Sequence, residues 1–155
     1  MKKIICTFIF LLLTNLSPAA MSGDSGNNQE NLYKTAKQLV LRAKKLEKKD
    51  KLEKALKLYS KAYDKLLTAY NKDKKNPDIL NYLGFTLRKA GNFEEAEKFY
   101  LRGLEIKPNH KGINEYLGEL YVKTNRIELA KERLEVLKGC KCEEFEELKE
   151  LIEEN

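Results

Sequence analysis

Residues 81–96, NYLGFTLRKAGNFEEA, decide the fold, because residues 115–130, EYLGELYVKTNRIELA, repeat their pattern 34 positions later. Each copy has the order of an apolar helix, a short turn that contains Gly or Asn, and a second helix. The residues that recur at this spacing are Leu83 and Leu117, Gly84 and Gly118, and Ala96 and Ala130. A fixed period of this length predicts helical pairs that stack on one another, since no single pair buries its apolar face alone.

Composition predicts the same class of structure. The chain has 155 residues, which suggests one domain, and its 42% hydrophobic content is sufficient for a core. Leu, Lys, Glu and Ala dominate, and all four are strong helix formers, whereas runs of Val, Ile and Thr, which favour strands, are scarce. We therefore expect an all-α protein.

An earlier copy of the unit is weaker. Its apolar positions are Leu39, Ala43, Leu46, Ala55, Tyr59 and Ala62. Ala55 precedes Ala96 by 41 residues, which is seven more than the period of the later copies. Seven residues are about two turns of helix. We therefore expect a lengthened second helix in the first unit, reaching about Asp73.

These positions resemble the pattern of the tetratricopeptide repeat (TPR) family. Residues 77–110 supply Leu80, Leu83, Gly84, Leu87, Ala96, Tyr100 and Pro108, and residues 111–144 supply Leu117, Gly118, Tyr121, Ala130 and Leu134. The last unit departs from the pattern at Asn114 and Cys142, which suits a terminal repeat. The resemblance implies a right-handed solenoid of about three repeats over residues 30–76, 77–110 and 111–142. Residues 143–155 are then a capping helix, with Phe145, Leu148, Leu151 and Ile152 facing inward.

The start of the chain has the order of a secretory signal peptide over residues 1–20. Lysines precede a 13-residue apolar run, residues 4–16, and small residues follow it. This run is shorter than the roughly 20 residues of a membrane span, so a cleaved signal is favoured over a retained anchor. We expect a periplasmic or secreted protein with a disordered leader at residues 21–29. Cleavage after Ala19, Ala20 or Ser22 remains open.

Charge is distributed unevenly. Residues 34–75 carry fifteen Lys or Arg against five Asp or Glu, whereas residues 143–155 carry seven Glu and one Lys. The two regions are interpreted either as solvated helix faces or as surfaces that steer partners of opposite sign. Nucleic acid is not expected as a partner, because no motif combines basic and aromatic residues and the chain is predicted to be exported.

Groups that carry chemistry are few. His110, the single histidine, lies in a turn between repeats and is expected to be solvated. No nucleophile–base pair, phosphate-binding loop or metal-spaced cluster is recognisable. We therefore expect no enzymatic activity, no cofactor, no metal and no small-molecule substrate.

Cys140 and Cys142 flank Lys141 at the turn before the predicted capping helix. In an oxidising compartment these thiols are expected to join in a disulfide that tightens the turn. The alternative is a redox or metal-handling pair, although two thiolates without a histidine are an incomplete zinc site.

The resemblance places a ligand-binding surface on the concave side, which the first helix of each repeat lines. The candidate residues there are Lys44, Asn81, Tyr82, Phe85, Arg88, Lys89, Tyr116 and Lys123. Exposed aromatic residues among charges are typical of peptide-binding grooves; alternatively, Tyr82 and Tyr116 pack between adjacent repeats. Some TPR domains clamp a terminal carboxylate with Lys and Asn. The matching positions here hold Val40, Lys44, Phe85, Gly112 and Tyr116, so that clamp is absent.

The functional hypothesis is a protein- or peptide-binding adaptor or scaffold of the bacterial envelope. The alternative is a thiol-active or metal-handling accessory protein that uses Cys140 and Cys142. Self-association also remains open, because the TPR fold does not specify its ligand.

Overall fold

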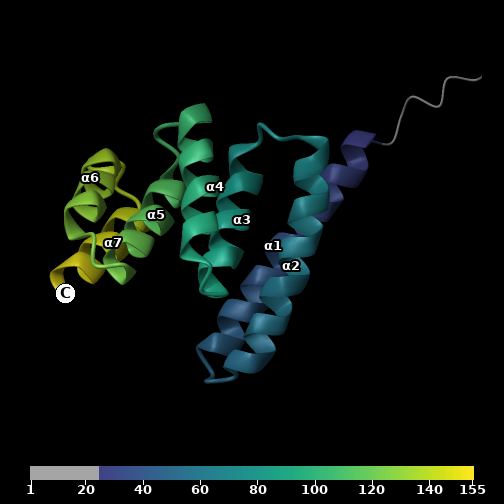
Figure 1. The fold of residues 1–155 in the computed structure, drawn as a ribbon, viewed down its shortest axis with the longest axis horizontal. Helices are drawn as coiled ribbons and strands as arrows, with labels where there is room; N and C mark the ends of the chain where they lie inside the picture. Colours follow the sequence, from purple (N-terminus) through teal and green to yellow (C-terminus); the bar gives the residue numbers. More distant parts are fainter. Residues whose placement is uncertain (1–24) are drawn as a thin grey trace, which may run out of the picture.

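The protein is described by a computed structural model over residues 25–155, and the expected signal peptide at residues 1–20 lies outside the described residues. This part of the chain consists of helices joined by short turns, without strands (Figure 1). The seven helices are α1 (Ser25–Glu47), α2 (Leu52–Lys72), α3 (Pro77–Lys89), α4 (Phe93–Ile106), α5 (Lys111–Lys123), α6 (Ile127–Leu137) and α7 (Glu143–Glu153).

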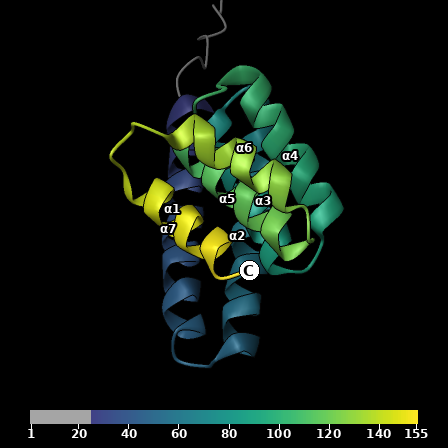
Figure 2. The same cartoon turned by 90° about the vertical axis from the view of Figure 1, so that its left-hand side faces the viewer.

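The helices stack as three pairs and a final single helix. Helix α1 packs on α2, α3 on α4 and α5 on α6, and the contacts of α2 with α3 and of α4 with α5 join the pairs in chain order. Helix α7 packs on α5 and α6, just as α5 packs on α3 and α4 (Figures 1 and 2). The predicted all-α repeat fold with a capping helix is therefore confirmed.

The turn inside each pair contains one residue in the left-handed region of backbone space. These residues are Asp50 (φ 55°), Gly91 (φ 84°) and Asn125 (φ 59°), and they occupy equivalent positions in the three pairs. Glycine, Asn and Asp are the residue types that adopt this conformation most readily. The turns thus confirm the sequence register, including the 41-residue spacing from Asp50 to Gly91.

The first pair is longer than the others. Helix α2 has 21 residues and α4 has 14, so the seven extra residues lie in the second helix, as predicted. The expected disordered leader up to residue 29 is wrong at its end, because α1 begins at Ser25. The C-terminal end of the long α2 lies beside the first turns of α1. There, Gln29 Nε2 donates a hydrogen bond of 3.5 Å to Oδ2 of Asp73, the residue that follows α2.

Each of the two repeated glycines leaves a space that a bulky side chain from another helix fills. A Cβ atom added to Gly84 would lie 2.5 Å from the ring of Tyr100, and one added to Gly118 would lie 2.5 Å from Cδ2 of Leu148. Gly84 therefore receives a side chain from α4 of its own pair. Gly118 receives one from the capping helix α7.

The structure corrects the expectation that His110 is solvated. His110 is 8% exposed and caps α5, since its Nδ1 accepts a hydrogen bond of 3.2 Å from the backbone N–H of Ile113. Its Nε2 therefore carries the proton and donates to Asp78 Oδ1 on α3, at 3.2 Å. His110 thus caps the first helix of the third repeat and also contacts the second repeat.

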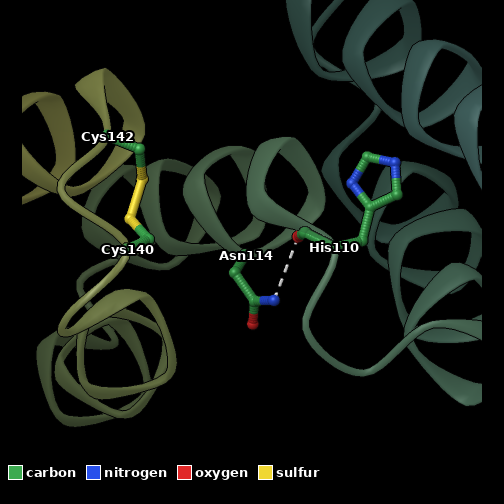
Figure 3. Close-up of a disulfide and its surroundings, with 4 residues drawn as sticks. All are labelled: His110, Asn114, Cys140 and Cys142. Atoms are coloured by element: carbon green, nitrogen blue, oxygen red, sulfur yellow. Dashed lines mark hydrogen bonds between the residues drawn. A yellow bond between two sulfur atoms is a disulfide. The ribbon is translucent and has the colours of Figure 1, made fainter.

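Asn114, which departs from the repeat pattern, stabilises the same turn. Its side chain is fully buried, and Nδ2 donates hydrogen bonds of 3.0 Å to the carbonyl oxygens of Pro108 and His110 (Figure 3). A buried amide is tolerated here because its donors are satisfied.

We expect His110→Ala to lower the free energy of unfolding by about 1–2 kcal/mol, because the first turn of α5 loses its capping acceptor. His110→Asn is the matched control, since asparagine restores an acceptor at the capping position and should recover most of the loss. Chemical denaturation followed by circular dichroism measures both. Equal destabilisation by the two substitutions would show that capping is not the role of His110.

Candidate functional site

A cavity of about 560 Å³ opens where α1, α3, α5 and α7 end. Its charged lining residues are Glu47, Arg88, Lys89, Glu119 and Lys123, and its apolar ones include Phe93, Val122 and Leu151. We call this cavity the inner groove. Because the last turns of α3 and α5 carry basic residues, part of the positive charge also compensates the negative ends of the helix dipoles.

A row of aromatic rings runs beneath one side of the groove. Tyr59 and Phe85 have ring centroids 5.6 Å apart, and those of Phe85 and Tyr116 are 4.9 Å apart. Arg88 lies over both of the last two rings, with Cζ 5.5 Å from each centroid. Lys44 Nζ lies 5.7 Å from the Phe85 centroid and 5.8 Å from that of Tyr116. These distances permit cation–π attraction.

Two of the groove cations are held by carboxylates. Arg88 Nη1 lies 2.6 Å from Glu119 Oε2, which joins α3 to α5. Glu47 accepts hydrogen bonds from Lys89 Nζ at 3.0 Å and from the Tyr59 hydroxyl at 2.8 Å. Burial opposes ionisation of Glu47, but these two hydrogen bonds outweigh it and hold the pKa of Glu47 below its usual value. These pairs fix the side chains rather than offering them to a ligand.

Lys44 and Lys123 are different, because neither forms an ion pair with any residue from 25 to 155. Lys123 is exposed at the groove, and Lys44 is partly exposed over the aromatic row. They are the two cations of this face that are available to an acidic ligand.

Glu115 adds no negative charge to this face at neutral pH. The side chain is 3% exposed. Burial, a hydrogen bond with Glu147 of α7 and the nearby charge of Glu119 raise the pKa of Glu115 to about 10. The protonated carboxyl donates to Glu147 and so ties the capping helix to α5.

Comparison with known proteins identifies the repeat. The family model described as "Tetratricopeptide repeat" matches residues 77–110, which contain α3, α4 and their flanking turns. Residues 77–110 are therefore a tetratricopeptide repeat, and the helices of residues 25–155 stack in the TPR fold. No curated protein sequence matches it.

Solved TPR structures share the fold at low sequence identity. The Yersinia enterocolitica type III secretion translocator chaperone SycD has a TM-score of 0.62 and 16% identity, over 88% of each chain. SycD in complex with a peptide of the translocator YopD has a TM-score of 0.54 and 17% identity, over 78% of this chain and 88% of that one. A TPR protein from Parabacteroides merdae has a TM-score of 0.55 and 16% identity over 77% of this chain. The match spans 59% of the length of the Parabacteroides protein.

The structure brings together most of the predicted TPR ligand-binding residues but buries two of them. Phe85 is 1% exposed, so the expectation that it is exposed is wrong. Tyr59 of α2 packs against its ring. Asn81 is also buried and fills the space beside Gly112. Tyr82 packs on Tyr33 and Tyr116 packs on Phe85, both remaining partly exposed, as the alternative of packing between repeats describes.

Sequence reasoning missed Glu47 and the contribution of the capping helix to the TPR groove. The 41-residue offset from Ala55 to Ala96 aligns Glu47 with Arg88. This alignment could have placed Glu47 on the same face as Arg88. Leu151 was expected to face inward for packing, but it also lines the groove. Helix α7 lies outside the repeats, so the repeat pattern could not predict that Leu151 lines the groove.

The structure places a disulfide between Cys140 and Cys142, with a Cα–Cα distance of 5.2 Å, in the turn between α6 and α7 (Figure 3). Cys142 is the N-cap of α7, whose first turn contains Glu143, Glu144 and Glu146. Within the described residues no group of His, Cys, Asp or Glu side chains has the arrangement of a metal site.

Proposed function

We propose that this TPR protein binds a segment of another protein in the inner groove, and that the segment carries at least one carboxylate beside an apolar side chain. The observation that carries the proposal is the groove itself. Phe93, Val122 and Leu151 provide apolar surface, and Lys123 supplies a lining cation without an ion-pair partner among the described residues. Lys44, which is likewise without an ion-pair partner there, adds a cation beside the groove, over the same Phe85 and Tyr116 rings that Arg88 of the lining covers. The lining side chains include three cations, Arg88, Lys89 and Lys123, against two carboxylates, Glu47 and Glu119.

The SycD complex supports the class of ligand, because a chaperone of similar fold is seen there with a peptide of the translocator YopD. Low identity means that the resemblance extends to the fold and not to the ligand. The preference for an acidic ligand is inferred from this chain's own lysines. The chain lacks the Lys and Asn residues with which some TPR domains hold a terminal carboxylate, so we do not expect it to bind its ligand in that way.

We further propose that the protein acts in the bacterial envelope after export, as the N-terminal signal sequence suggests. Within residues 25–155 no helix is both long and apolar enough to cross a membrane. The mass of the protein recovered from its own cell tests the proposal. Loss of the residues before position 20, 21 or 23 supports it, and an intact N-terminus contradicts it.

The binding proposal is tested by site-specific photo-crosslinking. A photoreactive residue at Lys123 should capture a partner, and the same residue at Lys131, an exposed lysine of α6 outside the groove, should not. Lys44→Gln should lower the yield at position 123 about tenfold, since hydrogen bonds to charged groups contribute about 1.5–3 kcal/mol.

Mass spectrometry of the captured peptide then reports whether acidic residues lie at the linkage. Equal yields at positions 123 and 131, or a yield unaffected by Lys44→Gln, would contradict binding in the groove. Lys131→Gln serves as the charge-matched control for Lys44→Gln, and the unfolding transition of each variant shows that the fold is retained.

A further inference from the structure

The end of the first helical pair projects away from the rest of the molecule. Residues 48–57, KKDKLEKALK, form the turn between α1 and α2 and the first turns of α2, and we call them the hairpin tip. Toward this end the pair contacts α3 through Glu47 with Lys89 and Tyr59 with Phe85, and Leu56 lines a small pocket together with Leu87. Beyond them the hairpin extends past the ends of the other helices (Figures 1 and 2).

The hairpin tip is almost wholly solvent-exposed and strongly basic. Every residue from 48 to 57 except Ala55 is exposed. Lys48, Lys49, Lys51 and Lys54 form no ion pair with any residue in the described range, whereas Lys57 is paired with Glu53. The remaining acid is Asp50, whose left-handed backbone forms the turn. The tip therefore concentrates unpaired positive charge at the most projecting point of the fold.

A leucine lies among these lysines. Leu52, the first residue of α2, is 54% exposed, the largest exposure among the exposed large hydrophobic residues of the described chain. Lysines surrounding a protruding apolar residue match the interface of a lipid bilayer, where anionic headgroups lie directly above acyl chains.

We propose that the hairpin tip docks on the surface of an anionic phospholipid bilayer, with Leu52 inserted between the headgroups and the lysines contacting phosphates. The tip is convex, so it can touch a planar surface without contacts from the other repeats. It contains no aromatic residue on which a nucleic-acid base could stack. The inner groove is a different surface, so the docked protein can still bind its partner.

The absence of tryptophan from the whole chain provides a local probe. In full-length Leu52→Trp the single indole reports only on the hairpin tip. We expect its fluorescence to shift to the blue with vesicles of phosphatidylcholine mixed with phosphatidylglycerol, and not with vesicles of phosphatidylcholine alone. The matched control is Leu101→Trp, which replaces a leucine of α4 that is 44% exposed; its fluorescence should not respond.

Replacement of the four unpaired lysines tests the electrostatic part. Each lysine close to an anionic surface raises partitioning about fivefold, so Lys48→Gln, Lys49→Gln, Lys51→Gln and Lys54→Gln together should weaken vesicle binding by Leu52→Trp several-hundred-fold, on the order of 5⁴. High salt should also reverse the shift, because the Debye length falls from about 10 Å at 0.1 M to about 3 Å at 1 M.

Three outcomes would overturn the proposal. The first is the lack of a blue shift with anionic vesicles, and the second is an equal shift for Leu101→Trp. The third is a shift of Leu52→Trp with polyglutamate or duplex DNA but not with vesicles, which would assign the hairpin tip to an acidic protein or to nucleic acid. Gln replaces Lys with little change in helix propensity, and circular dichroism confirms that each variant is folded.

Discussion

Gly84→Ala is expected to lower the free energy of unfolding by about 1–3 kcal/mol, although alanine is the better helix former. The added methyl carbon would lie 2.5 to 2.8 Å from three atoms of the Tyr100 ring. Tyr100 is fully buried, so its ring cannot turn into solvent. The two helices of the second repeat must then separate. Thermal unfolding followed by circular dichroism should show a midpoint several degrees lower.

Gly103→Ala is the matched control, since Gly103 is also buried within a helix of the same repeat. Its new methyl would meet only the terminal Cδ1 of Ile113 closely, a flexible group that can rotate away. We expect this variant to be neutral or slightly stabilised. A double-mutant cycle with Tyr100→Leu should recover most of the loss at Gly84; a loss of the same size in both backgrounds would mean that the ring is not the cause.

Stability is expected to decrease as pH rises from about 5 to about 9, and Glu115 is responsible. Its pKa rises from 4.5 in the unfolded chain to about 10 in the folded protein. Below pH 4.5 both states hold the proton, so the contribution of the neutral carboxyl is fully present there. Above that pH unfolding releases the proton, and stability falls by at most about 1.4 kcal/mol per pH unit until the folded-state pKa is reached.

Glu115→Gln separates this effect from other titrations. Glutamine keeps the shape and a donor toward Glu147 but binds no proton, so the pH dependence should flatten between pH 5 and 9. The other groups that act on Glu115 are Glu119, Glu147 and Lys44. Glu128→Gln, on an exposed glutamate of α6, is the control and should retain the wild-type slope. An unchanged slope in Glu115→Gln would show that Glu115 is ionised in the folded protein.

Much of the fold could be predicted from the sequence, because the repeat pattern expresses local geometry. The left-handed turn residues Gly91 and Asn125, 34 positions apart, and the buried Ala96 and Ala130 follow directly from the period. The partner of each glycine does not follow from it. Gly84 and Gly118 are equivalent in sequence, but the first is covered by its own repeat and the second by α7, and a period carries no information on an element beyond the array.

The candidate site was less predictable for a related reason. The first helices were correctly expected to line one face, but the exposure of a residue there depends on what packs above it. Phe85 is covered because Tyr59, at the position equivalent to Tyr100, packs on its ring. Likewise, Arg88 and Lys89 could be placed on the face, whereas their pairing with Glu119 and Glu47 depends on the spacing between repeats.

The contact of Leu148 with Gly118 also closes the surface on which a further helical pair would stack. Helix α7 contacts the third pair as the first helix of a fourth unit would. One leucine therefore occupies the small-residue position that the third pair presents to its next neighbour. An engineered extension would have to be inserted between Leu137 and Glu143, so that the added unit offers its own small residue to the displaced α7.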